Sequence, residues 1–201
     1  MQRINRGWGF VMLALAAVFM LPLVVLAQEA TPEALPGVMP GGAHASLQDV
    51  AGNSVGTVMF VEGEDGKVVI EAQVSTLPPG FHGFHIHSAG VCDATAAPPF
   101  SSGGEHLNPN GSAHRDHVGD LPPLLVMRDG TGGMAVVTDR FTLADLLDAD
   151  GSAVMIHELP DNVANIPERY GAPDEETLTG GDSGSPIGCG VIEQGMMQAV
   201  G

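Results

Sequence analysis

Most of the histidines in this chain lie close together, with one aspartate among them, in its middle part. Imidazole nitrogens and carboxylate oxygens are ligands for zinc and copper, and a metal needs several of them around one point. Of the eight histidines in 201 residues, six belong to this set. Its members are His85, His87, His106, His114, His117, Asp120 and His157. The sequence therefore predicts a zinc or copper centre.

His85 and His87 stand two residues apart in a predicted strand, so their side chains project from the same face. Phe84 and Ile86 then project from the other face, which we expect to be the core. Two neutral imidazoles on one strand face can bind a single metal. The pair alone is a weak signal, because cupins also use it, but a cupin needs a glutamate a few residues later and residues 88–91 contain none.

A second group of ligand residues, His106, His114, His117 and Asp120, lies within fifteen positions. Three nitrogens and one carboxylate oxygen form a closed tetrahedral zinc site. The spacing of three between the last members fits a helix face, but a glycine and two prolines nearby favour a loop. The alternative is a polar surface loop that happens to carry histidines.

His157 ends an apolar predicted strand, residues 153–156. A single histidine at a strand end is usually structural, but here it would complete a copper site beside the first histidine pair. We expect His44 to be exposed and His82 to be a structural histidine with its hydrogen bonds satisfied.

Short strands and turns must position these ligands. Eight strands are predicted, at residues 43–49, 55–62, 67–74, 81–87, 124–128, 134–138, 152–157 and 189–193, with one short helix at 141–147. This rhythm is typical of an all-β sandwich or barrel. Two long segments, 88–123 and 158–188, are rich in Gly, Pro and Asp, and long ordered loops are usually functional.

The N-terminal residues predict export. Residues 1–27 carry two arginines followed by an apolar run that ends in small residues, as a signal peptide does. The run is long for a signal and near the lower limit for a membrane span, so an uncleaved anchor is the alternative. Residues 28–42 form a Pro-rich linker, 43–195 the folded domain and 196–201 a C-terminal tail. The expected location is periplasmic or secreted.

The charge of the chain is strongly negative. All 24 acidic residues but only five of the seven basic ones follow residue 27, so the charge beyond that point is 5 − 24 = −19. This excludes nucleic acid as a partner and suits a soluble exported protein. The two cysteines, Cys92 and Cys189, are expected to form a disulfide after export, the alternative being two buried free thiols.

Several motifs together resemble the copper/zinc superoxide dismutase family, over residues 43–193. They are Gly80-Phe81-His82-Gly83-Phe84-His85-Ile86-His87, His106-Leu107-Asn108-Pro109, His117-Val118-Gly119-Asp120-Leu121, His157-Glu158 and Cys189-Gly190-Val191-Ile192. The short spacing between His114 and His117 is more similar to bacterial exported members than to animal enzymes. The resemblance implies an eight-stranded Greek-key β-barrel with an immunoglobulin-like arrangement.

The resemblance also implies the ligands of one copper and one zinc per chain. Copper would be held by His85, His87, His106 and His157, and zinc by His106, His114, His117 and Asp120. His106 would bridge the two metals, and Asp161 would orient one ligand of each. Cys92 and Cys189 match the family's internal disulfide.

The implied reaction converts superoxide to O2 and H2O2 by cycling copper between Cu(II) and Cu(I). His106 would leave copper on reduction and carry a proton, while zinc would hold the loop and set the basicity of His106.

One position departs from the family pattern. The family has an arginine three residues before the second cysteine, where it attracts superoxide; this chain has Pro186. Proline carries no charge, so we expect slower anion capture unless Arg115 or Arg169 compensates. One alternative is a copper- and zinc-binding protein with little catalysis. Another is a membrane-tethered structural domain with a vestigial site, which predicts lost ligands, whereas no ligand is lost here. The sequence leaves open whether the protein is a monomer or a dimer.

Overall fold

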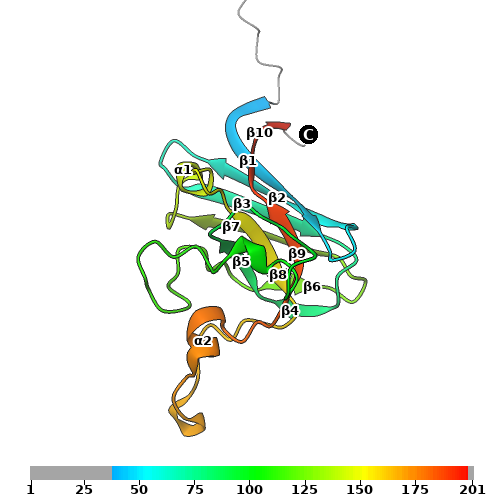
Figure 1. Ribbon diagram of the computed structural model, residues 1–201. Helices are drawn as coiled ribbons and strands as arrows, with labels where there is room; N and C mark the ends of the chain where they lie inside the picture. The colour runs from blue at the N-terminus through cyan, green and yellow to red at the C-terminus, as the bar shows by residue number, and fades with distance from the viewer. Residues whose placement is uncertain (1–37, 199–201) are drawn as a thin grey trace, which may run out of the picture. The chain divides into compact units, whose positions relative to one another are not determined.

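The computed structural model describes residues 38–198 and confirms an all-β fold (Figure 1). In this part of the chain the strands are β1 (Val38–Gln48), β2 (Ser54–Glu62), β3 (Val68–Val74), β4 (Gly80–His82), β5 (Phe84–His87), β6 (Leu124–Val126), β7 (Gly132–Thr138), β8 (Ala153–His157), β9 (Pro186–Val191) and β10 (Glu193–Gln198). The short α-helices are α1 (Leu143–Leu146) and α2 (Glu175–Gly180), and single 3₁₀ turns lie at Ser101–Gly103 and Glu168–Tyr170.

The predicted signal segment and most of the predicted linker lie outside the described residues. β1 starts at Val38, five residues before the boundary predicted for the folded domain, and β10 continues to Gln198, into the segment predicted as a tail. Among residues 38–198 there is no helix with the length and apolar character that crossing a bilayer requires.

The strands follow one antiparallel path in the order β4-β6-β7-β3-β2-β1-β9-β8-β5, and β10 pairs with β1. The two ends of this path, β4 and β5, are consecutive in the chain and are separated only by Gly83. The sheet therefore curls into a nearly closed barrel. Closure leaves few free strand edges, which is how all-β proteins avoid edge-to-edge association.

Residues 38–198 form ten strands where eight were predicted, because two predicted strands are each divided. The segment 81–87 divides at Gly83, whose N–H donates to Leu159 O (2.8 Å) and whose carbonyl accepts from His157 N (2.8 Å). A Cβ atom at Gly83 would lie 2.6 Å from Ser183 Cβ, so the chain needs glycine at this crossing. The last predicted strand divides at Ile192.

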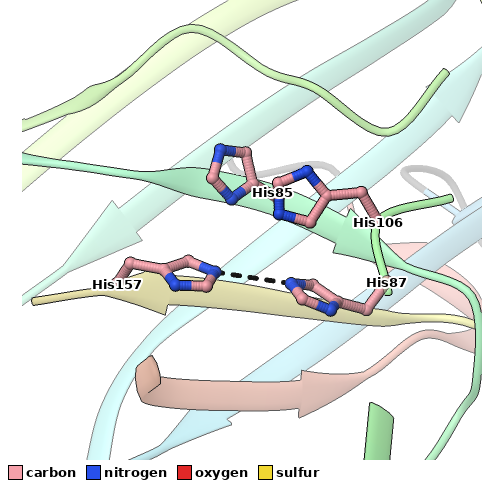
Figure 2. A group of neighbouring side chains, drawn as sticks. All are labelled: His85, His87, His106 and His157. Carbon is pink, nitrogen blue, oxygen red and sulfur yellow. Dashed lines mark hydrogen bonds between the residues drawn. The ribbon is translucent and has the colours of Figure 1, made fainter. Parts of the chain in front are cut away.

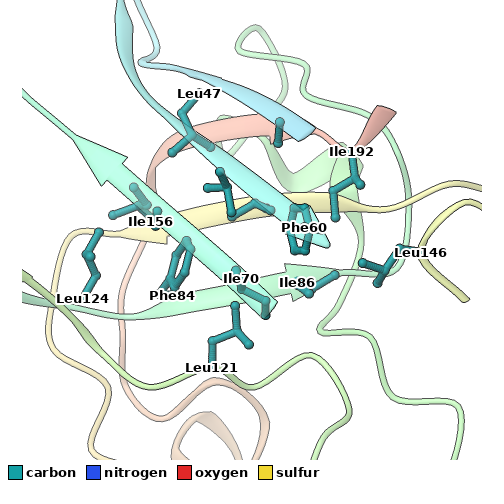
Figure 3. Packing of buried hydrophobic residues seen from close by; sticks show 14 of the residues in the cluster. Leu47, Phe60, Ile70, Phe84, Ile86, Leu121, Leu124, Leu146, Ile156 and Ile192 are labelled. Atoms are coloured by element: carbon teal, nitrogen blue, oxygen red, sulfur yellow. The ribbon is translucent and has the colours of Figure 1, made fainter. Parts of the chain in front are cut away.

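The core lies on one side of β5 and β8 (Figure 3). That side carries four apolar residues with no exposed surface: Phe84, Ile86, Val154 and Ile156. Each such side chain stabilises the fold by about 1.5–3 kcal/mol. The other side is also buried and carries His85, His87, Met155 and His157. Strand alternation therefore separates the ligand face of these two strands from the core, as predicted.

The predicted short helix is present as α1, capped by Thr142, whose side chain accepts from Asp145 N. The helix α2 in the second long loop was not predicted. Its signals were Asp174, whose side chain accepts from Thr177 N as an N-cap, and Gly181, which ends the helix with a positive φ of 61°. Six residues are too few for a periodic pattern, so only the caps could have indicated this helix.

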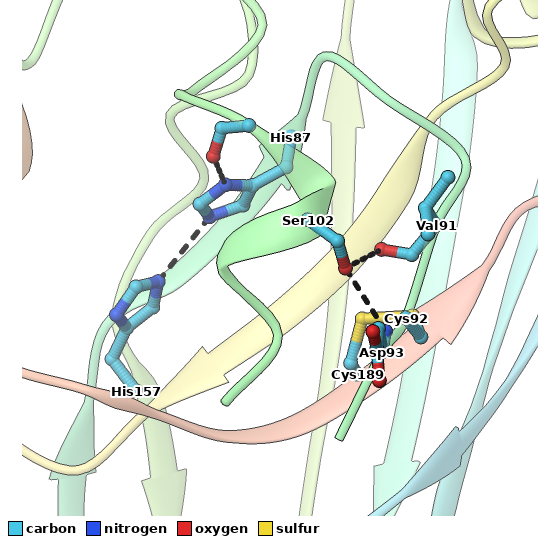
Figure 4. Close-up of a disulfide and its surroundings, with 8 residues drawn as sticks. His87, Val91, Cys92, Asp93, Ser102, His157 and Cys189 are labelled. Atoms are coloured by element: carbon cyan, nitrogen blue, oxygen red, sulfur yellow. Dashed lines mark hydrogen bonds between the residues drawn. A yellow bond between two sulfur atoms is a disulfide. The ribbon is translucent and has the colours of Figure 1, made fainter. Parts of the chain in front are cut away.

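The disulfide between Cys92 and Cys189 is present and joins the first long loop to β9 (Figure 4). The sulfur of Cys189 belongs to a small cluster with Phe100, Ala153 and Met155. This cluster lies on the ligand side of β8, because Ala153 and Met155 alternate with the core residues of that strand. The loop is thereby attached beside His87 and His157.

Candidate metal centre

The structure brings the seven predicted ligand residues into two groups that share one histidine. The first contains His85, His87, His106 and His157, and the second contains His106, His114, His117 and Asp120. In each group the potential ligand atoms all lie within 4.8 Å of one another. Both groups are largely buried, so the alternative of histidines dotted over a polar surface loop is wrong.

In the first group, His87 and His157 face each other from neighbouring strands (Figure 2). His87 Nδ1 donates to Gly104 O and His157 Nδ1 donates to Gly184 O, each at 2.8 Å. A carbonyl can only accept, so both protons are on Nδ1 and both Nε2 atoms carry lone pairs. These Nε2 atoms are 3.4 Å apart. Two lone pairs facing each other in a buried place repel unless a cation lies beside them.

Asp161 connects the two groups. Its Oδ2 atom accepts from His85 Nε2 and its Oδ1 atom accepts from His114 Nε2, both at 2.8 Å. The remaining nitrogens, His85 Nδ1 and His114 Nδ1, are buried and have no hydrogen-bond partner among the described residues. A buried polar atom without a partner is costly, and each of these atoms points into one of the groups. Both groups therefore fit a metal ion.

His106 stands between the groups. Its Nδ1 atom lies 2.8 Å from Asp120 Oδ1 and 3.3 Å from His117 Nδ1, which places this nitrogen in the second group. On its other side, the ring centroid is 4.0 Å from that of His85 and 5.0 Å from that of His87. One imidazole with two ring nitrogens can thus serve both groups.

Three histidines of the first group, His85, His87 and His157, are neutral imidazoles. Burial, helped by neighbouring imidazoles, lowers the pKa of His85 to about 4 and that of His157 to about 3. Burial also holds the pKa of His87 well below its usual value. Near neutral pH these rings therefore offer lone pairs without first losing a proton.

The second group carries both signs of charge. Burial acts to lower the pKa of His114, but the Asp120 carboxylate, 3.3 Å from Nδ1, and the hydrogen bond to Asp161 outweigh burial and raise that pKa to about 9. The histidines in turn hold the pKa of Asp120 far below its usual range, against the effect of burial. The carboxylates of Asp120 and Asp161 thus favour a positive charge in the second group. In the metal-free protein a proton on His114 supplies that charge.

Three glycine positions were missed by the sequence analysis. Gly181 lies against the Asp161–His114 hydrogen bond, and a Cβ atom there would overlap Asp161 Oδ1 and lie 2.5 Å from His114 Nε2. Its φ of 61° also favours glycine. Gly104 and Gly184 supply the carbonyls that orient His87 and His157, and their φ values are 75° and 73°. No ligand-type side chain marks such positions, so spacing rules cannot find them.

The two histidines outside the groups differ in surroundings. His82 is 2% exposed, and its ring nitrogens lie 2.7 Å from His157 O and 2.8 Å from Pro78 O. It is structural, as expected, and supports the backbone of His157. His44, expected to be exposed, is partly buried on β1.

Pro186 is the first residue of β9 and pairs with His157 of the neighbouring strand β8. Pro186 occupies the position at which the family has an arginine, so that position lies beside the first group. Arg169 stacks on Tyr170, with 4.6 Å between its guanidinium carbon and the ring centroid. Arg115 lies in the loop of the second group.

A hollow of about 400 Å³ reaches His106 and His117, and two of the residues lining it are the acids Glu105 and Glu175.

Comparisons with known proteins agree with this geometry. The family profile "Copper/zinc superoxide dismutase (SODC)" matches residues 54–192. The chain is 38% identical over 186 residues to the superoxide dismutase [Cu-Zn] of Mycolicibacterium paratuberculosis, covering 84% of this chain and 79% of the relative. It is 35% identical over 176 residues to that of Escherichia coli K12, covering 78% and 94%.

A solved structure, that of a SOD-like protein from Bacillus subtilis, superposes with a TM-score of 0.58 at 31% identity, covering 74% of this chain and 96% of that one. The two histidine-rich groups match the copper and zinc sites of the family. The chain therefore belongs to the copper/zinc superoxide dismutase family.

Proposed function

We propose that the protein catalyses the dismutation of superoxide to O2 and H2O2. Copper would be held by His85, His87, His106 and His157, and zinc by His106, His114, His117 and Asp120. Bound copper would supply one-electron redox chemistry between Cu(II) and Cu(I), whereas zinc is redox-inert. The observation that supports this most is the pair of Nε2 lone pairs of His87 and His157 facing each other at 3.4 Å.

The protein's own groups would keep these ligands in place. Backbone carbonyls fix the rings of His87 and His157, and Asp161 fixes those of His85 and His114. Such outer hydrogen bonds set the tautomer and orientation of a ligand. Since Nδ1 of His106 faces Asp120, its Nε2 atom is the one that would take up a proton and pass it towards the peroxide product.

We expect this protein to capture superoxide more slowly than family members that have the arginine. Pro186 offers no positive charge beside His157, and the lining of the hollow that reaches His106 includes the acids Glu105 and Glu175. Electrostatic steering changes association rates by about 10- to 1,000-fold. Replacement of the arginine would reduce the rate of encounter without changing the metal ligands.

The second candidate is a copper- and zinc-binding protein with little catalysis, and Pro186 is the observation that favours it. Both candidates need the same ligands, so metal binding alone does not separate them. They differ in turnover, and in what a positive charge at position 186 would do.

The test is superoxide consumption by the protein loaded with one copper and one zinc per chain, with metal content measured on the same sample and ionic strength varied. Copper-dependent turnover that is lost in His157→Ala supports the enzyme. The Pro186→Arg variant should then turn over faster and lose rate more steeply with salt. Full metal loading without turnover above the buffer background would leave the metal-binding candidate.

We propose an extracytoplasmic location, periplasmic or secreted. The signal-like residues 1–27 support it, and so does the disulfide, because such bonds persist in oxidising compartments. N-terminal sequencing of the protein from its host is the test. A start at Gln28 means cleavage, whereas an intact start at Met1 in the membrane fraction means an anchor.

A further inference from the structure

Arg140 lies outside both ligand groups, between β7 and α1, and its side chain contacts the loop that carries the second group. Its Nη1 atom donates to His117 O (3.0 Å) and to Arg115 O (3.3 Å), and its Nη2 atom also donates to Arg115 O (3.4 Å). These bonds reach 23 and 25 residues back along the chain, to the segment between two of the ligands. A guanidinium with several donors in one plane suits such a pair of acceptors.

The segment that Arg140 contacts needs outside support. Arg115 has a φ of 72°, a left-handed conformation that is unfavourable for a residue with a side chain. The turn around it has one internal backbone bond, from Asp116 N to Ala113 O (3.0 Å). Besides Arg140, the carbonyl of His117 accepts one backbone hydrogen bond, from Asp120 N (3.3 Å), and the carbonyl of Arg115 accepts none from the backbone of the described residues.

The bonds of Arg140 complete the support of His117. The N–H of His117 donates to Asp120 Oδ2 (3.1 Å), and its carbonyl accepts from Arg140, so both of its backbone polar groups are held. On the other side of the turn, His114 N donates to Leu178 O in α2 (3.0 Å). His114 and His117 are therefore held by contacts from two separate parts of the chain.

We propose that Arg140 is a positioning residue of the zinc site, which fixes the backbone of Arg115 and His117 so that the histidine rings are in place before the metal binds. This inference rests on the zinc ligands named in the proposed function. The guanidinium also lies 4.0 Å from Asp116, but the side chains of that pair are 40% and 68% exposed. An exposed pair contributes little, so the effect runs through the carbonyls.

The test measures zinc affinity of the purified full-length protein by competition with a chromophoric chelator. The visible spectrum of Co²⁺ in the same site reports ligand geometry, and copper affinity is measured in parallel. Arg140→Gln removes the donors, and Arg140→Lys keeps the charge without the planar fork. Asp116→Asn removes only the ion pair, and Arg128→Gln removes a matched exposed arginine from the turn after β6.

We expect Arg140→Gln to weaken zinc binding by about 10- to 100-fold and to change the Co²⁺ spectrum, with Arg140→Lys intermediate. Asp116→Asn and Arg128→Gln should bind zinc like the unaltered protein, and copper affinity should stay constant throughout.

Unaltered zinc affinity and Co²⁺ spectra in both Arg140 variants would overturn the inference. So would equal losses of copper and zinc affinity, which mean general destabilisation, or a loss in Asp116→Asn as large as in Arg140→Gln. If the unaltered protein itself bound neither Zn²⁺ nor Co²⁺ in this group, the proposed ligands would be wrong instead.

Discussion

The two ligand groups share His106 but are held in different ways. In the first group, three of the four histidines stand on the paired strands β5 and β8, with the hydrophobic core behind them. The second group comes from the first long loop alone, in residues 106–120, and depends on contacts from elsewhere. The sheet places three ligands of the first group, and Asp161 and two loop carbonyls only orient their rings. The second group lies wholly on a loop and depends on Asp161, α2 and Arg140.

The groups also differ in charge. The first contains imidazoles that burial keeps neutral, and the second contains a carboxylate and a histidine whose pKa is raised to about 9. A site on a rigid sheet can exclude protons by burial, while a site on a loop is held together by opposite charges. Asp161 joins the two kinds of site by bonding one histidine of each.

The largest expected effect comes from removing the disulfide, which attaches the first long loop beside the first group. Replacing Cys92 and Cys189 together by serine opens a closed loop of 97 residues. We expect the free energy of unfolding to fall by about 4–5 kcal/mol, because the unfolded chain gains entropy. Denaturant unfolding of the metal-free protein measures it, with the reduced, alkylated parent as control. A loss below about 1 kcal/mol would contradict the chain-entropy account.

The second prediction separates the groups by single ligands. His157→Ala should weaken copper binding by at least about 100-fold and leave zinc affinity nearly unchanged, since only the first group loses a nitrogen. His117→Ala should do the reverse. Metal affinities of the two variants, measured by chelator competition, check this. Equal losses of both metals in either variant would show that the groups do not act separately.

The third prediction concerns Asp161, which connects the two groups by bonding one histidine of each. Asp161→Asn keeps the shape but offers only one accepting atom where two histidines donate. Both metal affinities should fall, by about 10- to 100-fold each. The exposed Asp150→Asn serves as the control for loss of one charge. If only one affinity falls, Asp161 supports that site alone and the connection between the groups is without energetic effect.

The smallest effect for a single step concerns pH, about tenfold in zinc affinity for one pH unit. Zinc must displace a proton from His114, whose pKa is about 9 in the metal-free protein, so zinc affinity should rise by about tenfold for each pH unit from pH 6 to 9. The ligands His85 and His157 are already neutral above about pH 4, so their protons should not compete with copper in this range. Zinc and copper titrations at several pH values check the sign. If zinc and copper affinity changed equally with pH, the proposed difference in charge between the two groups would be wrong.

The local pattern of the sequence determined much of this protein. Alternation along residues 84–87 is enough to put His85 and His87 on one face and Phe84 and Ile86 in the core, because the period of a strand is two residues. The ligand types, the loop character of residues 88–123 and the cysteine pair also follow from composition and spacing. These features depend on near neighbours in the chain, which is why the sequence alone carries them.

Only the tertiary structure decided how distant segments meet. Asp161, whose role the sequence indicated only through the family resemblance, reaches His85 across 76 residues and His114 across 47. Arg140 reaches the ligand loop from the segment between β7 and α1. At Gly83, where one predicted strand divides, only glycine fits because Ser183, far along the chain, leaves no room for a Cβ atom. Such contacts depend on how the barrel closes and where each loop returns, and no local period in the sequence records that geometry.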